Sequence, residues 1–164
     1  MIEDKEKTSN MQKYENYKEQ FKRLKKALEN GFNLEAIFIE YAIMEDRTES
    51  VLRHAEKWEA YLKSRKGNEP TIDSKIKYIK KIAENKKDLS HKYFSDDLLQ
   101  EILLWKNERN RLIHALLKQD LKHNEISQLA LKGNELVKTL KTKSSNYNRA
   151  SERRRAKKEN EQIL

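Results

Sequence analysis

The sequence predicts an all-α protein, an up-down bundle of four to five helices with a basic C-terminal extension. Its 164 residues include only 3 glycines and 1 proline, too few for the many turns of an all-β fold. Apolar residues recur three and four positions apart along most of the chain, as they do in helices with one buried face. There is no cysteine, so disulfides and thiolate chemistry are excluded. A chain of this length can bury a core without such staples.

The first two predicted helices lie on either side of a glycine. Apolar residues at helical spacing place the first helix at 11–30, and Gly31 ends it, because glycine commonly follows the last turn of a helix. The second stripe runs over 34–62 and predicts one long helix. That helix should end before Gly67 and Pro70, which cannot continue it.

Three further helices follow in the second half of the chain. Thr71 or Asp73 can cap the third helix, since short polar side chains accept hydrogen bonds from a free first turn. Residues 85–94 are expected to form a loop. The fourth helix covers 95–119, and the fifth begins near 124 and keeps its apolar stripe to about 140.

The chain is expected to divide into one domain and two polar ends. Residues 1–10 are charged and featureless, which predicts a disordered N-terminus. Residues 11–143 form the helical domain. Residues 144–164 form a basic tail, helical or disordered, because the apolar stripe stops and Ser144-Ser145-Asn146 is a weak point for a helix.

The positive charge is concentrated near the C-terminus. The formal net charge is +9, and residues 138–158 hold nine basic residues and one acidic residue, which is +8 of that total. Such a block favours a polyanionic partner, most commonly nucleic acid, although a solvated helix end is the plain alternative. Tyr147 is the one aromatic residue of this block that could stack on a base. The candidate contacts are Arg149, Arg153, Arg154, Arg155, Lys157 and Lys158.

Two predicted helices carry a charged residue within their apolar face. At about 100° per residue, Arg109 falls in the middle of the apolar face of the fourth helix, and Asn110 and His114 lie together on its flank. Glu45 falls within the apolar face of the second helix, and Asp46 follows it. Because a lone buried charge is costly, Glu45 and Arg109 are expected to pair, as a structural ion pair or within a functional site.

The polar cluster of the fourth helix has a recognisable form. Arg109, Asn110 and His114 read Arg-Asn-x-x-x-His. This resembles the motif of the HEPN superfamily (higher eukaryotes and prokaryotes nucleotide-binding domains), in which an arginine precedes a histidine by a short spacer. The resemblance covers roughly 34–140 and implies an all-α bundle with the motif on a late helix.

The resemblance implies a metal-independent endoribonuclease, as found in toxin–antitoxin and phage-defence systems. Two protomers would bring their motifs together at a dimer interface. His114 would be the general acid or base for the ribose 2′-OH or the leaving 5′-oxygen, a role suited to its titration near neutrality. Arg109 would hold the scissile phosphate, and Asn110 would orient the histidine or the phosphate. Glu45 or Asp46 would supply an acidic residue facing the motif.

The expected partners are RNA, a second copy of the chain and an antitoxin protein. No cofactor or metal is expected, since His54, His91 and His123 are scattered and form no ligand set. Without an apolar run of ~20 residues or a signal-like N-terminus, we expect no membrane contact and a cytoplasmic location. Two alternatives remain: a non-catalytic HEPN-like module that binds RNA or protein, and a helical adaptor in which Arg109 and Glu45 only stabilise the fold.

Overall fold

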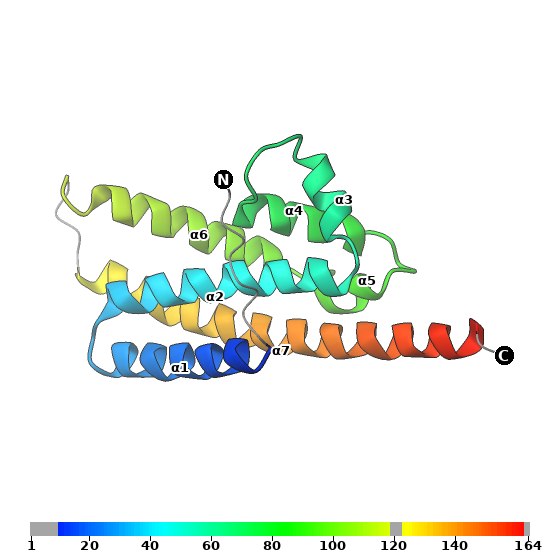
Figure 1. The fold of residues 1–164 in the computed structure, drawn as a ribbon. Helices are drawn as coiled ribbons and strands as arrows, with labels where there is room; N and C mark the ends of the chain where they lie inside the picture. Colours follow the sequence, from blue (N-terminus) through cyan, green and yellow to red (C-terminus); the bar gives the residue numbers. More distant parts are fainter. Residues whose placement is uncertain (1–9, 119–122, 163–164) are drawn as a thin grey trace, which may run out of the picture.

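The computed structural model describes residues 10–118 and 123–162, and its regular elements are all helices, which confirms the predicted all-α class. α2 packs against α1, α4 and α7, while α6 packs against α7 and α4 (Figure 1). The predicted disorder of 1–10 falls, up to residue 9, outside the described part, and α1 begins at Asn10. The described helices are α1 (Asn10–Glu29), α2 (Asn33–His54), α3 (Trp58–Ser64), α4 (Ile72–Ala83), α5 (Leu89–Phe94), α6 (Leu98–Ala115) and α7 (His123–Gln162).

The first helix ends where the sequence predicts. Gly31 has a positive φ of 72°, and the Phe32 amide donates to the Ala27 carbonyl at 2.8 Å. This is the left-handed closing turn that glycine adopts without strain.

The single long second helix predicted over 34–62 is wrong, because the same closing turn recurs inside it. Glu56 has a φ of 56°, and the Lys57 amide donates to the Leu52 carbonyl at 3.0 Å. A glutamate in this conformation leaves no glycine signal in the sequence. The chain therefore turns after α2, and α3 starts a new direction at Trp58 (Figure 1).

The expected loop at 85–94 contains the short helix α5. Asp88 caps it by accepting from the Ser90 amide at 2.8 Å. With six residues, α5 is too short to show helical periodicity. The cap predicted for the third helix is confirmed at Thr71, which forms a reciprocal capping box with Ser74.

The helix does not break at the weak point expected at 144–146, and α7 runs continuously for 40 residues. Ser144 and Tyr147 are buried, and the Tyr147 ring lies 5.5 Å from the ring of Phe94 and 5.9 Å from that of Tyr93. These contacts continue the packed stripe of α7 beyond residue 143. Because Tyr147 is 2% exposed, its ring is not available to stack on a base.

α2 is turned about its axis relative to the expectation. The stripe assumed to be its centre contains Leu34 and Phe38, yet both side chains are exposed. Ala36, Glu40 and Ile43 are buried instead, on nearly the opposite side of the helix from Leu34 and Phe38. The carboxylate predicted to be buried on α2 is therefore Glu40 rather than Glu45.

Gly133 lets α7 approach the buried Glu40. A Cβ built on Gly133 would overlap the Glu40 carboxyl group and lie 2.8 Å from the Trp105 ring. Both side chains are enclosed, with 0% and 3% exposure, so neither can move aside freely. The small residue is thus required by packing rather than by a turn.

We expect Gly133→Ala to lower the free energy of unfolding by about 1–3 kcal/mol, because the added methyl group overpacks the core. Urea unfolding followed by circular dichroism measures the change. Glu135→Ala is the matched control, because Glu135 is exposed on the same helix two positions later. Equal stability of the two variants would show that this contact relaxes without cost.

Candidate functional site

The three motif residues lie at the C-terminal end of α6. The guanidinium carbon of Arg109 is 4.3 Å from the centre of the Tyr41 ring and 5.2 Å from that of Phe38. Arg109 Nη1 also donates to Asn110 Oδ1 at 3.0 Å. Two aromatic faces and one amide therefore hold the cation in place.

No ion pair to Arg109 is formed by the carboxylates of the described residues. Its Nε is buried and lacks a hydrogen-bond partner. A half-buried arginine with donors but no counter-anion is suited to bind a phosphate, whose oxygens match its planar fork.

His114 lies one turn beyond Asn110 on the same side of α6 and is exposed. It forms no hydrogen bond or ion pair with the part of the chain that the structure describes. Its imidazole is therefore accessible to a ligand. We call the surface formed by Phe38, Tyr41, Arg109, Asn110 and His114 the motif face.

The expected Glu45–Arg109 ion pair does not form. Glu45 instead lies 3.7 Å from the buried Lys75 Nζ, which also donates to the Glu45 carbonyl at 3.1 Å. Glu45 still lies near Tyr41 of the motif face. Burial of Tyr41 raises the pKa of its hydroxyl group, the negative charge of Glu45 adds to the rise, and Arg109 opposes it. The helical-adaptor alternative, which rests on this ion pair, loses its basis.

Asp46 does not face the motif. It pairs with Arg47 at 2.9 Å and lines a cavity between α1, α2 and α7. Successive residues of a helix point about 100° apart, and here Asp46 lies on the cavity side of α2 while Glu45 lies on the side of Lys75. Of the two acidic candidates, the structure brings only Glu45 near the motif.

Glu40 is the buried acid that the helix wheel missed. It packs against Trp105, one turn before Arg109, and its carboxyl oxygens have no hydrogen-bond partner. Burial raises the pKa of Glu40 from 4.5 to about 9, so the group is neutral at pH 7. It lies beneath the motif helix and supports it by packing.

The basic residues lie on the exposed C-terminal half of α7. Arg149, Arg153 and Lys157 are exposed, as are the other three candidate contacts. Figure 1 shows this part of α7 continuing beyond the bundle, at the end opposite to the C-terminal end of α6. We call residues 149–161 of α7 the arm.

The arm and the motif face are far apart within one molecule. Arg111 Nη2 lies 3.5 Å from Glu125 Oε1, which joins the end of α6 to the start of α7. Arg154 comes 29 residues after Glu125 on one unbroken helix, which corresponds to about 40 Å. The two candidate RNA contacts therefore cannot act on the same few nucleotides of one protomer.

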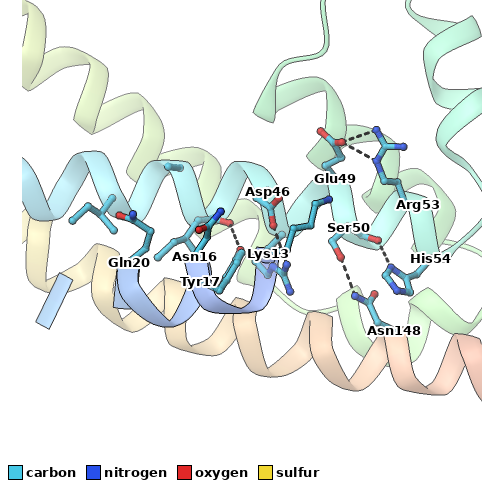
Figure 2. A pocket seen from close by; sticks show the side chains of 14 residues that line it. Lys13, Asn16, Tyr17, Gln20, Asp46, Glu49, Ser50, Arg53, His54 and Asn148 are labelled. Atoms are coloured by element: carbon cyan, nitrogen blue, oxygen red, sulfur yellow. Dashed lines mark hydrogen bonds and ion pairs between the residues drawn. The ribbon is translucent and has the colours of Figure 1, made fainter. Parts of the chain in front are cut away.

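A cavity of about 480 Å³ opens between the first half of α1, the second half of α2 and Asn148 of α7 (Figure 2). Asn148 Nδ2 donates to Ser50 Oγ at 3.0 Å, and Arg47 lies over the Tyr17 ring at 4.2 Å. We call it the amide cavity after the side chains of Asn16, Gln20 and Asn148 that line it. The sequence offers no motif for it, because its residues come from three separate helices.

Comparison with protein-family models, curated proteins and solved structures found no match for this chain. None of its described helices has the length and apolarity needed to cross a bilayer. Among the described residues, no group of three or more His, Cys, Asp or Glu side chains is placed to hold a metal ion.

Proposed function

We propose that the chain is a metal-independent endoribonuclease of HEPN type that acts as a homodimer in a toxin–antitoxin or phage-defence system. The observation that carries this proposal is the motif face itself. Arg109 is held by Asn110 and two aromatic rings without a described carboxylate partner, and an exposed His114 follows on the same helix. A structural arginine would instead be expected to have a counter-charge.

The chemistry needs few protein groups because RNA carries its own nucleophile. The 2′-oxygen attacks the phosphorus and loses its proton to a base, while the bond to the 5′-oxygen breaks and that oxygen gains a proton. His114 serves one of these proton transfers, and His114 of a second protomer can serve the other. Arg109 stabilises the charge that develops on the phosphate. The products are a 2′,3′-cyclic phosphate and a 5′-hydroxyl.

The test is incubation of a labelled single-stranded RNA with the full chain in EDTA, followed by analysis of the product ends. Cleavage with cyclic phosphate ends is the expected result. Cleavage that depends on added magnesium, or that leaves 5′-phosphate ends, would contradict the proposed mechanism.

The homodimer would bury the motif face, which already carries an exposed aromatic side chain. Phe38 is 55% exposed and lies against Arg109. We expect Phe38→Asp to convert the dimer into a monomer, seen by light scattering, and to abolish cleavage. Leu131→Asp is the control, because Leu131 is 57% exposed but lines a cavity with α1. A dimer that survives Phe38→Asp would place the interface elsewhere.

A non-catalytic RNA-binding module is the second candidate, and the separation of the arm from the motif face favours it. Binding through the arm needs no contribution from Arg109 or His114. This candidate predicts salt-dependent RNA binding without cleavage, since each phosphate contact releases bound counterions. Removal of residues 149–164 should then abolish binding.

A further inference from the structure

A second cavity lies on the arm side of α2. It has a volume of about 270 Å³ and is formed by the turn after α2, the start of α5 and the first turns of the arm. Four Lys or Arg side chains line it, against two acidic ones. We call it the arm cavity, with Lys57, Arg154, Arg155 and Lys158 as its cations.

Three of these cations are not held in an ion pair, and the Lys, Arg, Asp and Glu side chains that line the cavity sum to a charge of +2. Arg155 lies 3.3 Å from Glu56, and the other acidic residue, Asp88, is engaged as the cap of α5. Lys57, Arg154 and Lys158 form no ion pair with a described residue. Their convergence on one hollow produces a positive site that an anion with several oxygens, such as a phosphate, would fill.

The amide cavity is its neighbour, because His54 lines both. Asn148 is 9% exposed, and its buried Oδ1 has no hydrogen-bond partner. The buried Nε of Arg47, on the same cavity, also lacks one. Both atoms are enclosed, so an occupant that donates to Asn148 Oδ1 and accepts from Arg47 Nε would satisfy them once the two side chains turn toward the cavity.

The rest of the amide cavity suits a flat and partly apolar group. Ile39, Ala42 and Ile43 contribute apolar surface to its wall, and its volume lies within the range of small-ligand sites. A nucleobase combines apolar faces with an edge that carries both hydrogen-bond donors and acceptors. The adjoining arm cavity would take the phosphates attached to that base.

We propose that a segment of single-stranded RNA binds across the C-terminal end of α2, with one unstacked base in the amide cavity and its phosphates in the arm cavity. The choice of RNA rests on the proposed function, but this site is distinct from the motif face. Insertion of a base requires a single strand, since a duplex keeps its bases stacked.

The test measures binding of a fluorescent 2′-O-methyl RNA, which lacks the nucleophilic hydroxyl group and cannot be cut by the proposed mechanism. The binding measurement therefore does not depend on whether the chain cleaves RNA. The cleavage assay likewise does not depend on whether RNA binds at the amide cavity and the arm cavity. We expect a single strand to bind at least tenfold more tightly than the matching duplex. Equal binding of both would contradict the insertion of a base.

Two triple variants separate the arm cavity from general positive charge. Lys57→Ala/Arg154→Ala/Lys158→Ala should weaken binding at least tenfold and reduce the slope of log affinity against log salt by about 2. Lys22→Ala/Lys25→Ala/Lys26→Ala on α1 removes the same charge from exposed positions and should change binding less than twofold. Equal losses of RNA affinity in both variants would contradict a specific RNA site at the arm cavity.

Asn148→Ala tests the base pocket. We expect severalfold weaker binding with an unchanged salt slope, because no charge is removed. Wild-type RNA affinity in a folded Asn148→Ala protein would contradict the base pocket. Photocrosslinking of a thiouridine-labelled strand to the unaltered chain gives a second readout, expected at residues of the amide cavity. A crosslink confined to other residues, or displacement of the RNA by polyglutamate at equal charge, would assign the surface to a different partner.

Discussion

Replacing His114 by alanine should abolish RNA cleavage and leave the fold intact. The loss is expected to reach about 10²–10⁴-fold, the usual contribution of one positioned acid or base. Stability should be unchanged, because His114 is exposed and makes no described contact. Initial rates in EDTA and thermal unfolding of the same samples provide both measurements.

His123→Ala is the matched control for this variant. His123 is exposed at the start of α7, near the same end of the bundle, but lies outside the motif. Its replacement should leave cleavage within about twofold of the unaltered chain. Full activity in His114→Ala, or an equal loss in both variants, would remove the motif from the active site. A His114→Ala protein that fails to fold would indicate a structural role.

The stability of the protein should fall as the pH rises through the neutral range, because of Glu40. Its carboxyl group keeps its proton in the folded chain up to a pKa of about 9, whereas in the unfolded chain it loses the proton near 4.5. The stabilising contribution of this proton is complete below pH 4.5 and is lost between there and about pH 9. The slope approaches about 1.4 kcal/mol per pH unit, or about 4 kcal/mol between pH 5 and 8.

Glu40→Gln isolates this effect, since an amide does not titrate. Urea unfolding at pH 5 and pH 8 should show the variant gaining stability relative to the unaltered chain as the pH rises. Glu135→Gln, at an exposed position of α7, should follow the unaltered chain at both values. Parallel pH profiles for Glu40→Gln and the unaltered chain would show that Glu40 finds a partner or water in solution.

Helical periodicity is sufficient to predict the class of this fold and most of its helices. The residues at which the helices end are harder to predict from it. Gly31 signals its turn, whereas Glu56 adopts the same conformation in a residue type that rarely does so. The continuation of α7 depends on Tyr147 packing against α5, a contact with a helix that is itself too short to predict. Both features depend on tertiary packing, which the local sequence pattern does not reveal.

The orientation of α2 shows a second limit. This helix has apolar residues on more than one side. The large ones, such as Leu34 and Phe38, predict the wrong side as the core face. The side that packs into the core instead holds Glu40 opposite Gly133. A sequence cannot reveal such a complementary pair, because the carboxyl group and the glycine are far apart in the chain. Arg109, expected in the middle of the apolar face of its helix, is half-buried, and its partners are aromatic rings rather than Glu45.

The length of α7 fixes the distance between two surfaces of the molecule. A continuous helix separates the motif face from the arm cavity by about 40 Å, without a hinge between them. A stacked strand rises about 3.4 Å per nucleotide, so roughly a dozen nucleotides are needed to reach both surfaces of one protomer. Shorter oligonucleotides can occupy only one of the two. If the proposed activities are correct, α7 would set the distance between the site that binds the RNA and the site that cleaves it.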